Sequence, residues 1–228
     1  MSKFSFYSTA LAVGLTASSA FAGTSEACKK AMELSFDRGD VEINLTTHVR
    51  PFRLDHTKTR AELKRISGRS GRVLGSRING LTTSELKFGL KAAFSMFELS
   101  SGVSCIQPSS INIEVYYDSH DVYVAQEFPV GSCQYSVTLE HEKEHVRINN
   151  EMLRASSRGL DRYLKEHLHG SFPQRVYSQT QGMNDALEEM SNVISKYTKE
   201  QSASVEVQHA LLDSPRSYSE YASRCSRW

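Results

Sequence analysis

The sequence predicts an α+β fold, in which a small antiparallel sheet is followed by a mainly helical C-terminal half. Apolar and polar residues alternate in two stretches of the N-terminal half, at 41–45 and 111–128, as they do in half-buried strands. From about Ser136 to Leu212 apolar residues recur instead at helical spacing. Strands that come first and helices that follow are typical of an α+β arrangement.

The first 22 residues have the features of a secretory signal peptide. Lys3 gives a short positive beginning, Thr9–Phe21 is apolar and small, and Ala20-Phe21-Ala22 is a small-x-small cleavage pattern. We therefore expect export to the periplasm or the medium, and a mature chain of residues 23–228 that forms a single domain.

The charge balance argues against two classes of partner. The chain has a formal charge of +1, and Lys3 is the only charged residue of the signal segment, so the mature protein is about neutral. A neutral protein has no electrostatic attraction to nucleic acid. No run after the signal segment is apolar over the length of a membrane span, so we expect no membrane insertion of the mature form.

Four cysteines in an exported chain indicate two disulfides, because the oxidising compartment favours pairing. Four cysteines allow three connectivities. We favour Cys133 with Cys225, which leaves Cys28 with Cys105, and the sequence leaves the other two open.

The strand at 41–45 is followed by a short helix that begins at Thr59, where Glu62 completes a capping box. Residues 67–80 are rich in glycine and form a solvated loop rather than an anion-binding one in our interpretation, although the loop contains Arg69, Arg72 and Arg77.

A second capping box, Thr82 with Glu85, predicts a core-packing helix that ends near Gly102. The helical spacing is that of Leu86, Leu90, Ala93, Phe94 and Phe97. Two strands, 111–117 and 122–128, then form a hairpin around the turn-like residues 118–121.

The C-terminal half is predicted to be helical. One helix begins near Ser136 and continues, whole or as two helices, to Gly170 and Pro173. Another long or broken helix covers 183–212, and the tail from Ser214 to Trp228 is expected to be pinned to the body of the protein by its cysteine and aromatic residues.

The residues that carry chemistry are His141-Glu142-Lys143-Glu144-His145, which match His-Glu-x-x-His. On a helix, His141 and His145 differ by only about 40° around the axis, so both imidazoles reach one cation, and Glu142 lies off that stripe near a metal-bound water. Both histidines share a face with Val137, Ile148 and Met152, and imidazoles that face a core need a polar or metal partner.

These residues resemble the zincin metallopeptidases, in which a strand leads to a helix that bears His-Glu-x-x-His. The stretch from Gly80 to Gly170 is also similar to a poorly characterised bacterial family of secreted zinc-dependent proteases, through Gly80-Leu81-Thr82, Cys105 and the strands at 111–128. The resemblance implies a zincin-like active-site helix, Zn²⁺ as cofactor, His141 and His145 as zinc ligands, and Glu142 as the general base.

Two points stay open in the sequence. The run also matches the inverted motif His-x-x-Glu-His, in which Glu144 would be the base; we favour Glu142, because the inverted form is rarer. The third ligand is unassigned, because positions 148 and 151 are Ile148 and Glu151 rather than glycine and histidine. The candidates are downstream polar residues: Asp185, Glu188 and Glu189 first, then Glu151, Glu166, Glu206 and His209.

The remaining histidines have simpler interpretations. His167 and His169 are expected to cap or pack a helix end, and His120 to be solvated in the hairpin turn. Tyr218 and Tyr221 are expected to be packing aromatics, or to stabilise an oxyanion if the tail folds over the site.

The leading functional hypothesis is an exported zinc hydrolase that cleaves a peptide or protein with Glu142 as the base. The alternatives are a non-catalytic metal-binding envelope protein, and a disulfide-stapled interaction domain in which the motif is coincidental. Substrate specificity depends on pocket walls that a sequence does not display.

Overall fold

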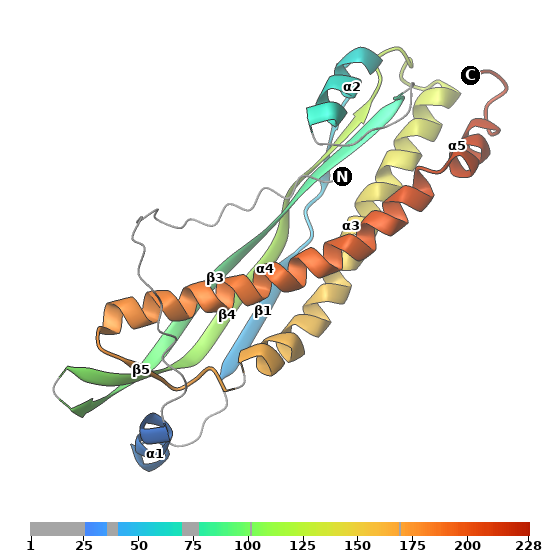
Figure 1. Ribbon diagram of the computed structural model, residues 1–228. Coiled ribbons are helices and arrows are strands. Elements are labelled where there is room, and N and C mark those ends of the chain that lie inside the picture. The colour runs from blue at the N-terminus through green and yellow to red at the C-terminus, as the bar shows by residue number, and fades with distance from the viewer. Residues whose placement is uncertain (1–25, 36–40, 70–77, 101, 169) are drawn as a thin grey trace.

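The computed structural model describes residues 26–35, 41–69, 78–100, 102–168 and 170–228. Figure 1 shows an elongated α+β molecule in which long strands and two long helices lie along one another. The order of elements confirms the predicted α+β class, with strands in the N-terminal half and a helical C-terminal half. The predicted signal segment, 1–22, and most of the arginine-bearing loop, 70–77, lie outside the described residues.

The strand β4 (Val103–Val124) is the central strand of a five-stranded sheet. One edge of β4 pairs antiparallel with β3 (Gly80–Ser100), and Gly102, with a φ of 77°, lies in the tight connection between them. The opposite edge of β4 pairs in succession with three short strands: β5 (Gln174–Val176), β1 (Glu42–His48) and β2 (Phe52–Asp55).

The expectation of an antiparallel sheet is wrong for part of that edge. The strands β1 and β2 run parallel to β4, with Ile43 opposite Ile111 and Leu54 opposite Val122, so the sheet is mixed. Parallel neighbours need a long crossover between them. Here α2 (Arg60–Arg69) and β3 supply it. The alternation of apolar and polar residues in a strand shows which face is buried. The same alternation occurs in parallel and antiparallel strands, so it does not predict the direction of pairing.

The predicted helix that begins at Thr82 is also wrong, because residues 80–100 form β3. The inward-facing residues alternate as in a strand: Leu86 is buried in the hydrophobic core, and Phe88, Leu90, Ala92 and Phe94 pack against that core. Ala93 and Phe97 are apolar as well, and they gave the segment an apparent helical period.

The predicted turn at 118–121 is absent, since β4 continues through it. Opposite this point, Ser84 pairs with His120 and Leu86 pairs with Tyr117, so one residue of β3 between these pairs faces two of β4. This β-bulge changes which residues of β4 point inward, from odd positions between Ile111 and Tyr117 to even positions from His120. In the sequence, this break in the alternation of apolar and polar residues has the same pattern as a turn between two strands.

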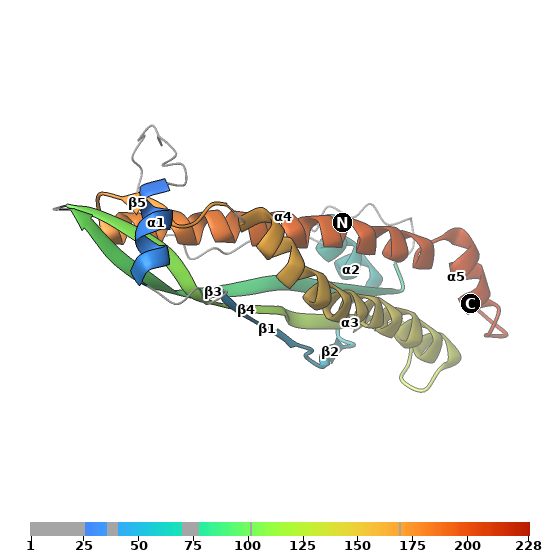
Figure 2. The same ribbon diagram turned by 90° about the horizontal axis from the view of Figure 1, so that it is seen from below.

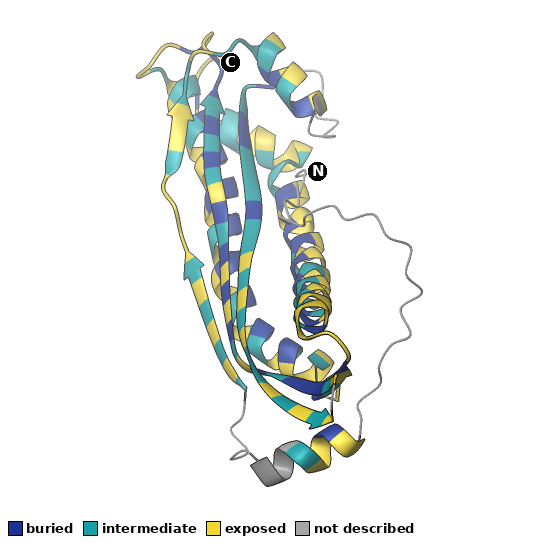
Figure 3. Ribbon diagram, turned by 90° about the vertical axis from the view of Figure 1, so that its left-hand side faces the viewer, coloured by how far each residue is buried: buried dark blue, intermediate teal, exposed yellow. Residues whose placement is uncertain are grey.

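Two long helices cover one face of the sheet, namely α3 (Cys133–Leu168) and α4 (Gln179–Leu212). The rotated view in Figure 2 shows α4 and the sheet as separate layers. Figure 3 looks onto the opposite face of the sheet, where exposed residues alternate with less exposed ones along the strands. The main core lies between the sheet and the helices, and its fully buried members include Ile111, Ile113, Leu160, Leu164, Met190 and Ile194.

The helices α3 and α4 are antiparallel, and the predicted helical segments are confirmed as these two continuous helices. The hydroxyl of Tyr197 on α4 donates to the carbonyl oxygen of Ser156 on α3 at 2.9 Å. Further along, the ring of His145 lies 4.8 Å from that of His209, measured between centroids. Each step forward along α3 is therefore matched by a step back along α4. In the described part of the chain, no helix is both long and apolar enough to span a membrane.

Both preferred disulfides are confirmed. Cys28, on α1 (Glu26–Ser35), is bonded to Cys105 on β4, and Cys133, at the start of α3, is bonded to Cys225 just beyond α5 (Pro215–Ala222). The second bond pins the tail to the body, as predicted. Two disulfides are typical of proteins of oxidising compartments. The capping box at Thr59 is confirmed too, since Glu62 accepts from the backbone N–H of Thr59 at 2.8 Å.

Candidate metal centre

Two imidazoles and one carboxylate come together where α3 and α4 meet α5. The histidines His141 and His145 lie two and three turns into α3 and are buried, with side chains 5% and 4% exposed. The carboxylate is that of Asp213, which caps the C-terminus of α4 and whose backbone N–H donates to the carbonyl oxygen of His209. These three residues form a group that could hold a metal ion.

The atoms that converge are specific. The Nε2 atom of His141 lies 3.2 Å from Oδ1 of Asp213, and Nε2 of His145 lies 3.1 Å from the same oxygen. Ligand atoms at about 2.0–2.2 Å from a tetrahedral metal ion lie about 3.3–3.6 Å from one another. Both distances to Asp213 are therefore close to those in a metal-ligand set, and all three ligand atoms lie within 4.8 Å of one another.

Electrostatics keeps Asp213 ionised. Partial burial acts to raise the pKa of this carboxyl, but hydrogen bonds to His141 and His145, and their charge, outweigh burial and hold the pKa well below its usual value. A metal ion that took the place of the imidazole protons would meet the same three atoms.

The glutamate of the His-Glu-x-x-His motif, Glu142, lies beside this group of three and is 4% exposed. Its Oε2 accepts a hydrogen bond from Oγ1 of Thr82 on β3 at 2.8 Å. Burial raises the pKa of Glu142, while the nearby imidazoles of His145 and His141 and the bond from Thr82 oppose that rise. The carboxylate is thus held in one orientation by the sheet, next to both histidines.

Glycine at position 80 makes room for Glu142. An ideal Cβ on Gly80 would lie 2.6 Å from Oε1 of Glu142 and 2.7 Å from Cγ2 of Thr138, closer than real Cβ atoms approach other atoms. The start of β3 therefore contacts α3 through backbone, and Glu142 fills the space of the missing side chain.

The alternative base, Glu144, is placed differently. Its carboxylate is bound by the guanidinium of Arg147, with Nε donating at 2.8 Å to Oε2, on the solvent side of α3. That hydrogen bond lowers the pKa of Glu144. A carboxylate that is paired with arginine and kept ionised is a weaker proton acceptor than Glu142.

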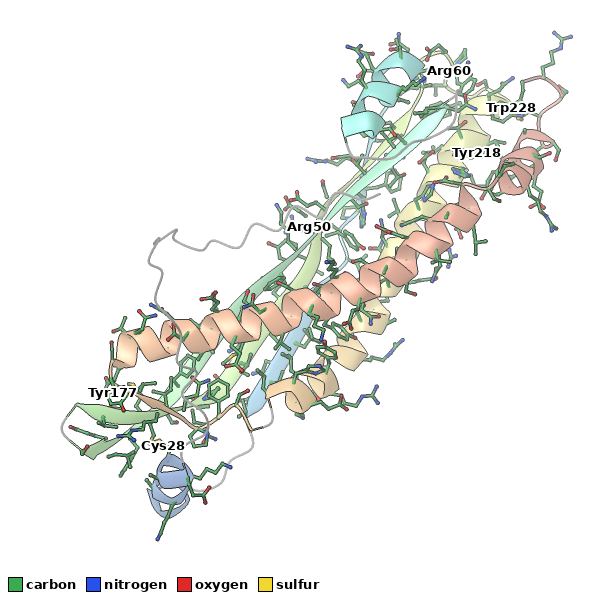
Figure 4. All side chains as sticks on the ribbon, in the orientation of Figure 1. Cys28, Arg50, Arg60, Tyr177, Tyr218 and Trp228 are labelled. Atoms are coloured by element: carbon green, nitrogen blue, oxygen red, sulfur yellow. A yellow bond between two sulfur atoms is a disulfide. The ribbon has the colours of Figure 1, made fainter. Side chains whose placement is uncertain are left out.

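Two tyrosines of α5 cover the centre. The ring of Tyr218 stacks on His141 with centroids 4.9 Å apart, and Tyr221 meets the same imidazole edge-on at 5.0 Å. The hydroxyl of Tyr218 also donates to Oδ1 of Asp213 at 3.1 Å. The tail thus folds over the site, as the sequence had left open, and Figure 4 places Tyr218 at this end of the molecule.

The proposed third-ligand candidates lie elsewhere. Glu151 is bound to Arg147, Asp185 accepts from Gln181, and Glu189 accepts from Ser171 and Gln174, while Glu166, Glu188 and Glu206 are exposed. His209 contacts His145 but does not belong to the group of three. Sequence reasoning missed Asp213. The only signal that could have found it is the length of α4. Because α4 runs back antiparallel to α3, its C-terminal end comes to lie opposite His141.

The other histidines are only partly as expected. His120 is wholly buried in β4 rather than solvated. The ring Nδ1 of His167 bonds to the carbonyl oxygen of Tyr163 at 2.9 Å near the end of α3, which fits a role in packing that helix end. His169 lies outside the described residues.

Comparison of the chain with protein-family models, with curated proteins and with solved structures finds no match. The function must therefore be inferred from the residues of the site.

Proposed function

We propose that the protein is an exported zinc-dependent hydrolase that cleaves peptide bonds in a peptide or protein substrate. The observation that carries the proposal is the convergence of His141 and His145, through Nε2, on one oxygen of Asp213 beside the buried carboxylate of Glu142. Two histidines and one carboxylate, with a fourth position left for water, are the ligand set of many catalytic zinc sites.

The donors fit zinc better than the other common divalent ions. Imidazole nitrogen is a preferred ligand of Zn²⁺, whereas Mg²⁺ and Ca²⁺ favour sites made of oxygens. The three protein ligands would be His141, His145 and Asp213. The ionised state of Asp213 offsets part of the charge of the ion in a buried place.

When bound, zinc would act as a Lewis acid and lower the pKa of a water in the site to about 7. Glu142 takes a proton from the attacking water and later delivers it to the leaving amine. Burial raises the pKa of Glu142, and a higher pKa makes its carboxylate a better proton acceptor. Thr82 holds the carboxylate in one orientation, and the hydroxyl of Tyr218 donates to Oδ1 of Asp213, which orients that ligand.

The choice of a peptide substrate rests on the resemblance of the motif to zincin metallopeptidases. The assignment to the periplasm or the medium rests on the two disulfides and on the signal-like residues 1–22.

The test compares the mature protein, residues 23–228, with Glu142→Gln and Glu144→Gln. Each is assayed for bound zinc and for hydrolysis of a quenched-fluorescence peptide library. We expect stoichiometric zinc in all three, loss of hydrolysis in Glu142→Gln, and near-normal hydrolysis in Glu144→Gln. Full activity of Glu142→Gln would overturn the mechanism. Loss in Glu144→Gln alone would instead assign the base to the inverted motif.

A second candidate function is a metal-binding protein without turnover. It is favoured by the burial of the centre, where both imidazoles are at most 5% exposed and Tyr218 stacks on one of them. This candidate predicts stoichiometric zinc with no hydrolysis by the wild-type protein, and equal zinc affinity in the wild type and in Glu142→Gln. Absence of stoichiometric metal would point to an interaction domain instead.

A further inference from the structure

We infer that His209 and Asn149 are positioning residues that fix which nitrogen of His145 faces the metal. The inference rests on the metal centre of the proposed function. A row of hydrogen bonds begins at His145 on α3, crosses to His209 on α4 and returns to Asn149 on α3. It then continues into the sheet at Ser84 on β3 and His120 on β4.

The direction of the row is set at Asn149. Its Nδ2 donates to Oγ of Ser84 at 3.0 Å, and its Oδ1 therefore faces His209. That oxygen lies 2.9 Å from Nε2 of His209, and an amide oxygen can only accept. The proton of His209 is thus on Nε2, and a neutral ring with a proton on Nε2 has a lone pair on Nδ1.

The next bond transfers this choice to the metal ligand. Nδ1 of His209 lies 2.8 Å from Nδ1 of His145, a distance at which one of the two must donate. Because Nδ1 of His209 accepts, Nδ1 of His145 donates. In the neutral ring that a metal ligand must be, the lone pair of His145 is then on Nε2, which is the atom that lies 3.1 Å from Asp213. Metal-bound histidines commonly donate their second ring N–H to such a partner, which fixes the tautomer and orientation of the ring.

The far end of the row is consistent with the same direction. Since Ser84 accepts from Asn149, its own hydroxyl donates to Nδ1 of His120 at 2.8 Å. Nε2 of His120 then donates to Oδ1 of Asn150 at 3.2 Å. Burial lowers the pKa of His120, which keeps this ring neutral and able to accept. Every hydrogen bond along the row therefore points away from the metal centre.

The reverse direction would disable the ligand. If the amide of Asn149 were turned round, its Nδ2 would donate to His209, Nδ1 of His209 would donate to His145, and the proton of His145 would be on Nε2, facing Asp213. The hydroxyl of Ser84 and the two amides thus select a histidine tautomer from across the helix pair. Mutation of such partners of a metal ligand commonly costs about 10- to 100-fold in metal affinity.

The test measures zinc affinity by competition with a chromophoric chelator, and the histidine tautomers by long-range ¹H–¹⁵N NMR of the mature protein with and without zinc. The variants are His209→Leu, which removes the acceptor, and His209→Asn, whose amide can supply an acceptor near the position of Nδ1. Val205→Ala is the matched control, because Val205 is buried on the same helix but takes no part in the row.

We expect Nδ1 of His145 to be protonated in the wild type with and without zinc, and Nε2 to carry no proton in the zinc-bound protein. Zinc affinity should fall about 10- to 100-fold in His209→Leu and be largely restored in His209→Asn. Val205→Ala should lower the melting temperature of the metal-free protein and leave zinc affinity unchanged. A His145 ring without a proton on Nδ1, or wild-type affinity in His209→Leu, overturns the inference while the metal centre stands. Failure of the wild type to bind zinc overturns the metal centre itself.

Discussion

Gly80 and Glu142 are matched in size: the strand has no side chain where the carboxylate lies, and a Cβ there would come within 2.6 Å of Oε1. We predict that Gly80→Ala displaces Glu142 and lowers hydrolysis strongly. Zinc should stay bound, because the added Cβ would meet Glu142 and Thr138 and none of the three proposed ligands. The measurements are kcat/KM on the best library peptide and zinc content.

The control for this substitution is Gly89→Ala on the same strand, where the nearest atoms to an added Cβ belong to Glu114 at 3.9 Å, an ordinary contact. Gly89→Ala should retain activity. Normal hydrolysis in Gly80→Ala would show that the position of Glu142 does not matter to the reaction.

Asp213 is predicted to be the third ligand. Replacement by asparagine keeps the size of the side chain but removes the charge that attracts the cation, so zinc affinity should fall by more than the roughly 10- to 100-fold typical of an outer partner. Asp185, a ligand candidate on sequence grounds, lies on an exposed part of α4, and Asp185→Asn should bind zinc as the wild type does. Competition titrations of both variants decide between the two acids, and equal affinities would remove Asp213 from the ligand set.

Metal removal should destabilise the protein, because the ligands join α3 to the end of α4. A ligand at 1,000 times its Kd adds about 4 kcal/mol to the free energy of unfolding. For a chain of this size, that corresponds to a rise of about 8–16 °C in melting temperature. Differential scanning calorimetry with excess zinc and with chelator measures it. His145→Asn should show no such difference, and an unchanged melting temperature in the wild type would contradict a bound metal.

The two disulfides should differ in their effect on the metal centre. Removal of either pair by serine substitution is expected to cost about 2–5 kcal/mol of stability. Only Cys133→Ser/Cys225→Ser should also weaken zinc binding, because that bond holds the tail that stacks Tyr218 and Tyr221 on His141. In Figure 4 Cys28 lies at the opposite end of the molecule from Tyr218. Equal zinc affinities of the two double variants would show that α5 does not support the site.

The sequence predicted those elements whose stabilising contacts are local. Thr59 and Glu62 bond to each other within one turn, and the capping box was confirmed. Thr82 and Glu85 have the same spacing, yet Thr82 donates to Glu142, which is 60 residues away. A capping pattern does not predict the conformation of a residue whose partner is remote in sequence. Pairing with the edge of β4 makes this segment the strand β3.

Only the part of the site that lies on a single helix could be predicted from the sequence. The inward direction of His141 and His145 follows from their spacing and from the apolar residues on the same face. Asp213 has no such local signal, because it follows α4 as a single acid and its relation to His141 depends on how two helices align. The buried row through His209, Asn149 and Ser84 likewise joins three elements, and each residue by itself looks like an ordinary polar residue.

The paired alignment of α3 and α4 also limits how this chain can vary in length. One residue inserted into α4 between Tyr197 and Asp213 would turn the end of the helix by about 100° and advance it by about 1.5 Å, which carries the carboxylate away from both imidazoles. Insertions at 170–173, between α3 and β5, leave the helix alignment intact, because they lie outside the paired segments. Relatives with the same centre should therefore keep a fixed number of residues from the Tyr197 position to the Asp213 position, and concentrate their length differences in that connection.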